Sequence, residues 1–396
     1  MTESNTRRGF PVEEFEQRAQ KAQDLLRDKG ISALLVCTEP EVRYLTGFHT
    51  PFWQSPTRPW FVILPISGKP IAIIPSIGET SMRETWVEDI RTWSSPNPVD
   101  EGISLLSNTL KEVLKLDSKT SDQSLQVGLP MGNETHLRMP VNDFEQLIKN
   151  LQPHVFVDAT EIIKSLRCIK SEREISKISK ICGIVSEGFA SLPNLLNIGM
   201  TEREAFHSFR LKLLELGADD VPYLVGATGP GFSDIIKQPS DRIIEPGDLI
   251  MFDTGSTYDG YFSDFDRNMA FHFTTDEAKS AYEIVWKATE AALKVALPGN
   301  TTSDLWKVMG SVLEAESERN DSVGRFGHGL GMQVTEWPSN TRNDETVLTE
   351  GMVLTVEPNL SWGDGYIMVH EENFVVRPDG AELLSKRASQ ELEIIN

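Results

Sequence analysis

The sequence predicts a two-domain protein that mixes helices and strands, with an α/β arrangement in its first half. The chain has 396 residues, which is longer than most single domains, since one domain usually holds about 150 residues. Apolar residues make up 39% and charged residues 24%, an ordinary balance for a chain that buries a core. Apolar strands alternate with amphipathic helices until a long helical pattern begins near residue 171. We therefore expect domains at 1–165 and 166–396.

The elements of the first half follow from the period of the apolar residues and from turn residues. An apolar helical stripe runs through residues 11–30 and is ended by Gly30. Two apolar runs joined by Ser67-Gly68-Lys69 predict a hairpin. The polar stretch 116–124 is expected to form a loop. In order, we expect a helix at 11–30, strands at 31–37, 60–66 and 70–75, a helix at 102–116, a strand at 126–129, a helix at 141–150 and a strand at 154–158.

The second half begins with a long helix at 171–196, whose isoleucine and valine residues recur on one side. A later helix has a capping-box pattern, Thr274 followed three residues later by Glu277. Its apolar stripe runs to Val295, and Pro298-Gly299 closes it. These helices are expected to be scaffold.

Charge and cysteine usage disfavour several classes of partner. The formal net charge is −21, which repels nucleic-acid backbones and anionic lipid. Cys37, Cys168 and Cys182 are far apart and form no CxxC pair, so neither a disulfide framework nor a thiolate zinc site is indicated. The N-terminus is polar, and no run approaches the roughly 18 apolar residues of a membrane span. We expect a cytoplasmic protein without nucleic-acid or membrane partners.

A first predicted hairpin brings aspartates together. Residues 249–254 and 261–271 are strand-like, and Thr257-Tyr258-Asp259-Gly260 supplies turn residues. A turn centred between Tyr258 and Asp259 places Asp253 opposite Asp264, whereas a turn at Asp259-Gly260 places it opposite Asp266. Side chains alternate with period two, so Asp264 shares a face with Asp253 in either register.

A second predicted hairpin pairs two glutamates. The three-residue loop Gly363-Asp364-Gly365 places Glu357 opposite Glu371 and sends Glu372 to the other face. A loop one residue longer would reverse the choice between Glu371 and Glu372.

These pairs suggest a metal centre. Like charges directly across a strand pair repel, so either each pair lies on a wet face or a cation neutralises both. Two pairs with apolar flanks favour the cation. His328, between glycines in Phe326-Gly327-His328-Gly329-Leu330-Gly331, offers a nitrogen ligand. Four carboxylates and one imidazole suit Mn(II), Fe(II), Co(II) or Zn(II) better than copper.

The ordered set of Asp253, an aspartate eleven residues later, GHGLG around His328, VEP ending at Pro358 and HEEN from His370 resembles the M24 metallopeptidases. That family includes methionine aminopeptidase, prolidase, Xaa-Pro aminopeptidase and the non-peptidase creatinase. The resemblance implies an α+β "pita-bread" catalytic domain preceded by an α/β creatinase/prolidase-type N-terminal domain. It also implies a homodimer.

The resemblance assigns a role to each of five side chains around two divalent ions. Asp253 would chelate one ion, Asp264 and Glu371 would bridge both, and His328 would complete the second site. Glu357 would be a ligand and a proton shuttle in the hydrolysis of an amide bond.

The sequence departs from the family where substrate is bound. The resemblance leads us to expect histidines seven residues after His328 and near residue 236, but Thr335 and Ile236 stand there. Losing one such donor typically costs about 10²- to 10³-fold in rate. We expect Thr335, Glu336 and Trp337 to offer a hydroxyl, a carboxylate and an aromatic wall to a cationic or amide-bearing small molecule. The alternative for Trp337 is a plain packing role.

An aromatic-basic cluster in the first domain, Phe52, Trp53, Arg58 and Trp60, is a further candidate for substrate contact or for dimer packing. The leading hypothesis is a hydrolase that cleaves a C–N bond in a small substrate, with a Xaa-Pro dipeptide as first guess. One alternative is a non-peptidase hydrolase or lyase acting on an amino-acid derivative or osmolyte. The other is a non-catalytic binding protein, which predicts broken metal ligands.

Overall fold

The computed structural model describes residues 8–117, 124–316 and 324–396. The chain divides into two compact units, Arg8–Arg167 and Cys168–Asn396. This division falls at the end of helix α6 (Thr160–Arg167), beside the predicted boundary after residue 165. Most of the stretch 116–124, which we expected to form a loop, lies outside the described residues.

The first unit is built on one six-stranded sheet in the order β4-β3-β2-β1-β5-β6. Strand β1 pairs antiparallel with β2 and parallel with β5. The predicted hairpin is confirmed, since β2 and β3 pair antiparallel with Phe61 opposite Ile73. The strands are β1 (Ala33–Val36), β2 (Phe61–Pro65), β3 (Ile71–Pro75), β4 (Asp89–Trp93), β5 (Gln126–Leu129) and β6 (Val155–Asp158).

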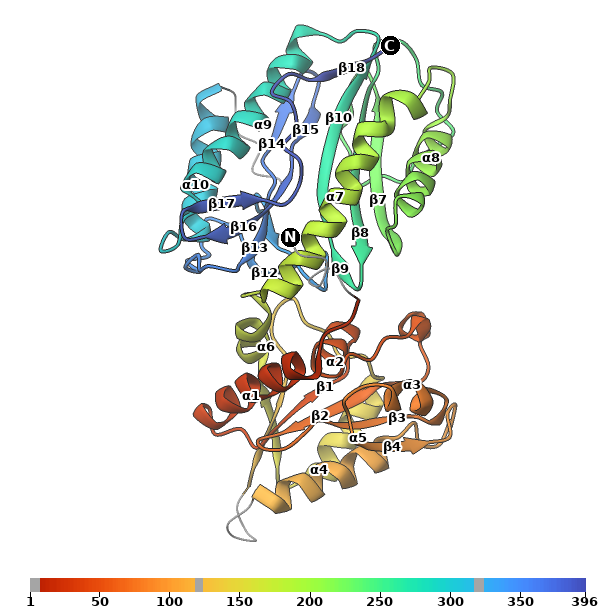
Figure 1. The fold of residues 1–396 in the computed structure, drawn as a ribbon, viewed down its shortest axis with the longest axis vertical. Coiled ribbons are helices and arrows are strands. Elements are labelled where there is room, and N and C mark those ends of the chain that lie inside the picture. The colour runs from red at the N-terminus through yellow and green to blue at the C-terminus, as the bar shows by residue number, and fades with distance from the viewer. Residues whose placement is uncertain (1–7, 118–123, 317–323) are drawn as a thin grey trace. The chain divides into compact units, whose positions relative to one another are not determined.

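Helices cover both faces of this sheet, and Figure 1 shows α1 and α4 on opposite sides of it. Strand β1 is buried on both faces, as expected for an apolar run without alternation. Leu35 packs in a core cluster with Leu106 and Leu147, which α4 and α5 contribute. The helices are α1 (Val12–Asp28), α2 (Glu39–Thr46), α3 (Glu79–Arg83), α4 (Ile103–Asp117), α5 (Val141–Leu151) and α6, with short 3-10 turns at Pro51–Gln54 and Ser76–Gly78.

The described residues of the second unit form three sheets and four helices. One sheet has the order β18-β10-β8-β7 with β9 paired to β8, another has the order β12-β11-β13-β16-β17, and β14 pairs with β15. Its strands are β7 (Asp220–Gly229), β8 (Leu249–Tyr258), β9 (Tyr261–Phe262), β10 (Phe265–Phe271), β11 (His328–Gly329), β12 (Glu336–Ser339), β13 (Val353–Val356), β14 (Asn359–Trp362), β15 (Tyr366–Val369), β16 (Glu372–Arg377), β17 (Gly380–Leu383) and β18 (Glu393–Ile395).

Two helix pairs flank these strands, which gives the pita-bread arrangement expected from the resemblance. Helices α7 (Glu172–Leu195) and α8 (Glu202–Glu215) contact each other, and each contacts β7 or β8. Helices α9 (Asp276–Val295) and α10 (Thr302–Glu316) form the second pair, which Figure 1 shows on the other side of the strands. Asp253 lies within β8, and Asp264, Glu357 and Glu371 lie in short breaks between strands of this unit.

The caps of α7 and α9 show how local sequence sets helix starts. At α7, Ser171 and Glu174 form a reciprocal capping box, as the helix predicted at 171–196 requires. At α9 the prediction of Thr274 as cap is wrong. The helix begins at Asp276, and the side chain of Thr275 accepts a hydrogen bond from the backbone of Ala278 at 3.1 Å. Two adjacent threonines made the sequence assignment ambiguous by one residue.

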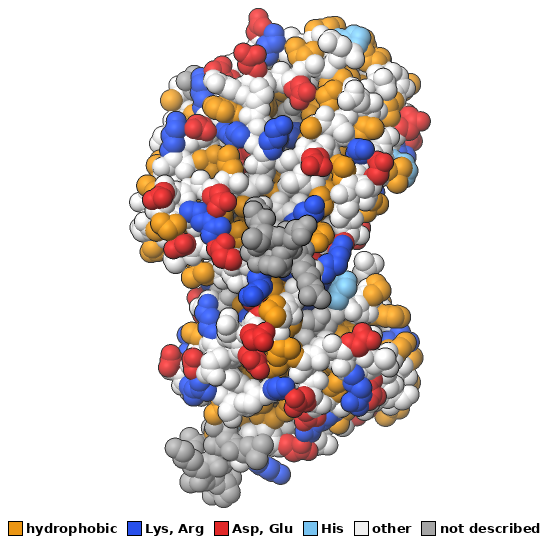
Figure 2. All heavy atoms as spheres, viewed as in Figure 1, with side chains coloured by type: hydrophobic (Ala, Val, Ile, Leu, Met, Phe, Trp, Pro, Cys, Tyr) orange, Lys and Arg blue, Asp and Glu red, His pale blue; other side chains and the backbone are white. Residues whose placement is uncertain are grey.

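The visible face of the protein carries charges of both signs (Figure 2). On the face drawn in Figure 2, Asp and Glu side chains are interspersed with Lys and Arg. Among the described residues, no helix has the length and apolar character needed to cross a bilayer. The acidic groups with a chemical role are therefore to be sought among the buried ones.

Candidate metal centre

The first hairpin adopts the register with its turn at Asp259-Gly260. Both turn residues have positive φ, 49° and 76°, as a two-residue type I′ turn requires. Asp253 consequently lies opposite Asp266, and the alternative register with Asp253 opposite Asp264 is wrong. Asp264 lies in the short break between β9 and β10, where its backbone N–H donates to Asn373 Oδ1 at 2.9 Å.

The second hairpin has the predicted register. Asn359 pairs with Val369 in β14–β15, and Val356 pairs with Glu372 in β13–β16. Both pairs belong to one continuous register, so Glu357 falls opposite Glu371, in the interval between the two paired segments. The loop of residues 363–365 holds glycines with φ of 51° and 89° at its ends. The short loop thus fixes which glutamate faces the first hairpin.

His328 is held by a backbone that only glycine permits. A Cβ at Gly327 would lie 2.3 Å from the carbonyl oxygen of Thr355, and one at Gly329 would lie 2.0 Å from that of Trp337. The His328 Nδ1 lies 2.9 Å from the Gly329 carbonyl oxygen. This contact fixes the ring and leaves Nε2 directed at Asp264, whose Oδ2 is 3.4 Å away.

Three of the predicted ligands meet directly. One donor atom each from Asp264, His328 and Glu371 lies within 4.8 Å of the others, and all three side chains are buried. Asp253 Oδ1 and Glu371 Oε1 are buried without a hydrogen-bond partner. Unsatisfied carboxylate oxygens in a buried site are costly, so the cluster has the character of an ion site.

The carboxylates of the two hairpins strongly perturb one another. Burial raises the pKa of Asp253 to about 6. Burial, reinforced by Asp253, raises the pKa of Glu357 to about 8. Burial and then the charges of Asp253 and Glu357 raise the pKa of Asp264 well above its ordinary value, and Glu371 behaves likewise. A divalent cation would reverse these shifts by favouring the ionised forms.

The pKa of the His328 imidazole is shifted in the opposite direction from those of the carboxylates. Burial, followed by the nearby Arg325 guanidinium, lowers the pKa of His328 to about 4. The ring is therefore neutral at physiological pH, which is the form that binds metals.

Glu371 and Glu372 occupy different environments, which separates their roles. Burial raises the pKa of Glu372, but Arg267, His370 and hydrogen bonds from Ser385 and the Ala388 backbone hold it below its usual value. Glu372 is thus an ionised, fully partnered structural group. Glu371 Oε1 lacks such a partner and faces the other carboxylates.

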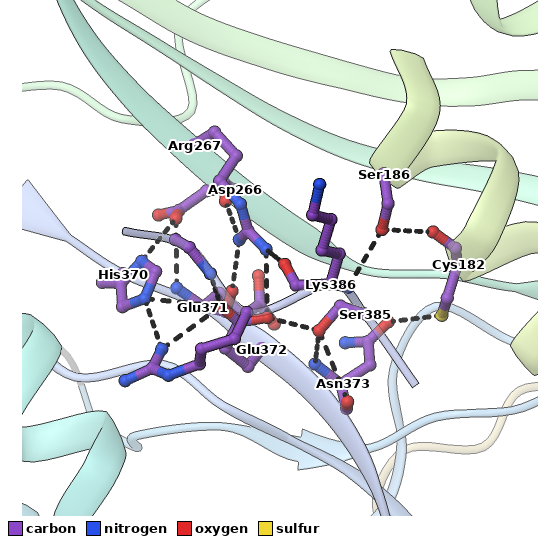
Figure 3. Close-up of polar contacts among 12 residues, drawn as sticks. Cys182, Ser186, Asp266, Arg267, His370, Glu371, Glu372, Asn373, Ser385 and Lys386 are labelled. Atoms are coloured by element: carbon purple, nitrogen blue, oxygen red, sulfur yellow. Dashed lines mark hydrogen bonds and ion pairs between the residues drawn. The ribbon is translucent and has the colours of Figure 1, made fainter. Parts of the chain in front are cut away.

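Asp266 is a buried carboxylate that the sequence analysis did not select as a site residue. Its Oδ1 accepts a hydrogen bond from the backbone of Glu371 at 3.0 Å, and its Oδ2 has no hydrogen-bond partner. Arg267 donates to the Glu371 carbonyl oxygen at 3.0 Å from the same strand (Figure 3). Asp266 and Arg267 together fix the backbone of Glu371. The sequence did contain an indication of Asp266, since one of the two predicted hairpin registers placed it opposite Asp253.

Tyr223 is a second residue that sequence reasoning missed. Its hydroxyl donates to Asp253 Oδ2 at 2.8 Å, and Val225 of the same strand pairs with Asp253 in the β7–β8 register. Burial and then the charge of Asp253 raise the pKa of Tyr223 far above its ordinary value, so it remains a donor. No local motif indicated this contact, which joins residues 30 positions apart.

The three residues predicted to contact substrate beside His328 lie in different surroundings. Glu336 does not offer a free carboxylate, which corrects its predicted role. Its side chain is 1% exposed, lies 3.1 Å from Lys170 Nζ and accepts from the Gln333 backbone at 3.1 Å. Thr335 is half-buried and accepts a hydrogen bond from Arg325 at 3.3 Å. Trp337 is buried.

Two other predicted contacts have surroundings of a different kind. Ile236 is 71% exposed and offers no donor side chain. Arg58 belongs to the first unit, where its guanidinium stacks 5.7 Å from the Phe52 ring centroid. In that unit Arg138 donates to the backbone carbonyls of Trp53 and Arg58, so the cluster has an internal packing role.

Comparisons with known proteins agree with this fold. Residues 176–378 match metallopeptidase family M24, and residues 18–169 match the creatinase/prolidase N-terminal domain. The chain is 27% identical to a Xaa-Pro dipeptidase of Pyrococcus horikoshii over 93% of this chain and 97% of the relative. It is 31% identical to the Pyrococcus furiosus Xaa-Pro dipeptidase over 58% of this chain and 67% of that one.

A solved structure, the recombinant prolidase of Thermococcus sibiricus, has a TM-score of 0.84 and 27% identity, covering 96% of this chain and 99% of that one. The family model spans half of the present chain, including all five residues of the two hairpins and the glycine-flanked loop. Family membership carries with it a requirement for divalent metal. The chain belongs to metallopeptidase family M24 and is a peptidase-like metallohydrolase with a creatinase/prolidase-type N-terminal domain.

Proposed function

We propose that the protein is a dipeptidase that uses two divalent ions to hydrolyse the peptide bond of a small substrate, with Xaa-Pro dipeptides as its first candidates. The observation that carries this proposal is the buried cluster of Asp264, His328 and Glu371, with unsatisfied oxygens on Glu371 and on nearby Asp253. The relatives named as Xaa-Pro dipeptidases supply the substrate class.

The donor set fits a pair of divalent ions. Asp253, Asp264, His328, Glu357 and Glu371 would hold them, because four carboxylates balance the charge of two such ions and a neutral imidazole adds a nitrogen donor. These are hard and borderline ligands, which favour Mn(II), Fe(II), Co(II) or Zn(II). Bound there, the ions would acidify a water molecule and polarise the substrate carbonyl.

The side chains then have separate tasks. Glu357 takes up the proton of the attacking water and returns it to the leaving nitrogen, which is the work of a general base and acid. Tyr223 holds Asp253 through its 2.8 Å hydrogen bond, and Asp266 holds the backbone of Glu371. The Gly329 carbonyl fixes the tautomer and direction of His328.

One observation favours a second candidate, a non-peptidase hydrolase or lyase acting on an amino-acid derivative or osmolyte. The positions where the resemblance leads us to expect imidazole donors carry Thr335 and the exposed Ile236. A non-catalytic binding protein is less well supported, because that reading predicts broken ligands and all five residues are present.

Activity on dipeptides distinguishes these candidates. The metal-loaded protein should cleave Xaa-Pro dipeptides in the presence of Mn(II) or Co(II), and Asp264→Ala should lose both metal and turnover. Thr335→His restores a donor at the expected position and should raise kcat. If neither the wild type nor Thr335→His cleaves any dipeptide while holding metal, the non-peptidase candidate replaces the dipeptidase.

Two further features belong to this proposal. We expect a homodimer in the cytoplasm, on the strength of the family resemblance and the composition. Sedimentation velocity at micromolar concentration tests the first, with a single species of twice the chain mass as the expected result.

A further inference from the structure

Two short breaks in the strands of the second unit hold the residues that would bridge the ions. Asp264 lies between β9 and β10, and Glu371 lies between β15 and β16. A residue in such a break has no regular ladder to hold its backbone, although its buried backbone groups still need partners. The distance between the two carboxylates therefore depends on the contacts that replace the ladder.

The backbone groups of Asp264 point away from β8. In an antiparallel strand, the backbone groups of successive residues point to alternate sides. The N–H of Ser263 donates to the Ser256 carbonyl oxygen of β8 at 2.9 Å, so the N–H and carbonyl of Asp264 point to the opposite edge. Strand β18 pairs with that edge only from Met269 to Phe271. Beside Asp264, the partners must come from somewhere other than a strand.

The side-chain amide of Asn373 supplies both partners. Its Oδ1 accepts a hydrogen bond from the Asp264 N–H at 2.9 Å, and its Nδ2 donates to the Asp264 carbonyl oxygen. This pair fixes the orientation of the amide, because a backbone N–H only donates and a backbone carbonyl only accepts. Asn373 thus acts toward Asp264 as a neighbouring strand would.

Asn373 is itself held firmly. It is fully buried in β16, where it pairs with Thr355 of β13. Figure 3 shows its links to Cys182 of α7 and to Ser385. Cys182 Sγ donates to Asn373 Oδ1 at 3.3 Å, and the Asn373 N–H donates to Ser385 Oγ at 3.1 Å. A side chain that is locked by its own neighbours can hold another group in a defined place.

The backbone of Glu371 is held in the same way, by side chains of β10. Its N–H donates to Asp266 Oδ1 and its carbonyl oxygen accepts from Arg267, both at 3.0 Å. Asp266 follows Asp264 by two residues, and Asn373 follows Glu371 by two residues. Each of the two ligands is thus followed by a side chain that holds the backbone of the other. We call Asn373, Asp266 and Arg267 the reciprocal clamp.

We propose that Asn373 is a positioning residue that, through this reciprocal clamp, fixes the separation of Asp264 and Glu371 and so sets the affinity for the second ion. The inference rests on the proposed two-ion function. Ligands on one side of the cluster suffice for a first ion, whereas a second ion needs both shared carboxylates at a set distance. Residues that orient metal ligands typically contribute about 10- to 100-fold in affinity.

Calorimetric titration of the metal-free full chain with Mn(II) measures the two affinities. Asn373→Ala removes both bonds to Asp264. It should weaken binding of the second ion by about 10- to 100-fold and of the first by less than about threefold. Asn373→Thr keeps one hydroxyl for these bonds and should give an intermediate loss.

Asn268→Ala is the matched control. Asn268 is also buried, and its Nδ2 donates at 2.7 Å to the carbonyl oxygen of Val369, which is not one of the five expected ligands. The control should lower the Tm, as Asn373→Ala does, because each loses a buried hydrogen bond. It should bind both ions with the affinities of the wild type.

Hydrogen exchange tests the clamp without metal or turnover. In the metal-free protein, the Asp264 amide should exchange at least about 10-fold faster in Asn373→Ala than in the wild type, because its acceptor is gone. The Glu371 amide should keep its wild-type rate, since Asp266 still holds it. A general loosening of the fold would speed both amides and would contradict a positioning role.

These measurements separate the inference from the proposed function. If two ions bind but no dipeptide is cleaved, only the dipeptidase proposal fails. A wild type that binds a single ion would overturn both. The inference alone is overturned if the Asp264 amide exchanges at the same rate in Asn373→Ala and the wild type, or if Asn373→Ala and Asn268→Ala bind Mn(II) with equal affinities.

Discussion

Removing metal from this protein should make its second unit lose stability as the pH rises from 7 to 8.5. Burial, reinforced by Asp253, raises the pKa of Glu357 to about 8. An unfolded glutamate titrates near pH 4.3, so in this window the unfolded chain is ionised while the folded, metal-free chain keeps a proton. A folded pKa above the unfolded value gives stability that is present at low pH and lost as pH rises through the folded pKa.

The magnitude follows from the proton count. One extra bound proton costs 1.36 kcal/mol per pH unit, so Glu357 alone accounts for about 1 kcal/mol over this window. Asp264 and Glu371, whose pKa values burial also raises, act in the same direction and add to this loss. His328 contributes little, because burial lowers its pKa to about 4 and an unfolded histidine is largely neutral above pH 7.

Thermal unfolding measures this loss. The second unit has roughly 230 residues, so its unfolding entropy near Tm is about 0.5 kcal/mol per kelvin, and the Tm should fall by at least about 2 °C. Calorimetric scans of chelator-treated protein at pH 7 and 8.5 give the value. The Mn(II)-loaded protein is the control, because its carboxylates are ionised at both pH values.

A matched variant isolates the group responsible. Glu357→Gln cannot lose the proton, so its metal-free form should show a smaller fall in Tm than the metal-free wild type. The reasoning is refuted if the Tm of the metal-free wild type does not fall between pH 7 and pH 8.5. It is also refuted if the Mn(II)-loaded protein shows the same change in Tm as the metal-free protein.

Two further outcomes follow from the packing around the site. Glu371→Gln should reduce the metal bound per chain. Glu372→Gln should keep the metal but destabilise the fold by about 3 kcal/mol, because Arg267 loses a buried partner. Elemental analysis measures the bound metal and chemical unfolding the stability, and equal metal loss in the two variants would contradict the assignment. Gly327→Ala should destabilise the protein and lower its metal content, because a Cβ there meets the Thr355 carbonyl, whereas Gly324→Ala meets nothing and should be neutral.

The fold was largely predictable because its elements are marked by local chemistry. Turn residues located the first-unit hairpin at Ser67-Gly68-Lys69, and the three-residue loop at 363–365 gave the register that opposes Glu357 to Glu371. The register of the first catalytic hairpin was left open, although an Asp-Gly pair is the expected type I′ turn and would have decided it. The prediction that Asp253 and Asp264 share a face did not depend on the register, because side chains alternate with period two and both registers place the two residues on one face.

The substrate side of the site was less predictable because its contacts are long-range. Glu336 appeared to be a free carboxylate, but its partner Lys170 lies 166 residues away in the sequence. Tyr223 donates to Asp253 from the neighbouring strand β7, and Arg325 donates to Thr335, ten residues further along the chain. None of these pairings follows from spacing within one element, and each needs the tertiary structure.

The most direct test of the metal centre is an anomalous-scattering crystal structure of the protein loaded with Mn(II). Two manganese peaks per chain are expected, both within bonding distance of Asp264 and Glu371, with Asp253, His328 and Glu357 completing the ligands. A single peak, no peak, or ions bound to other residues while these five side chains keep their present positions would contradict the account.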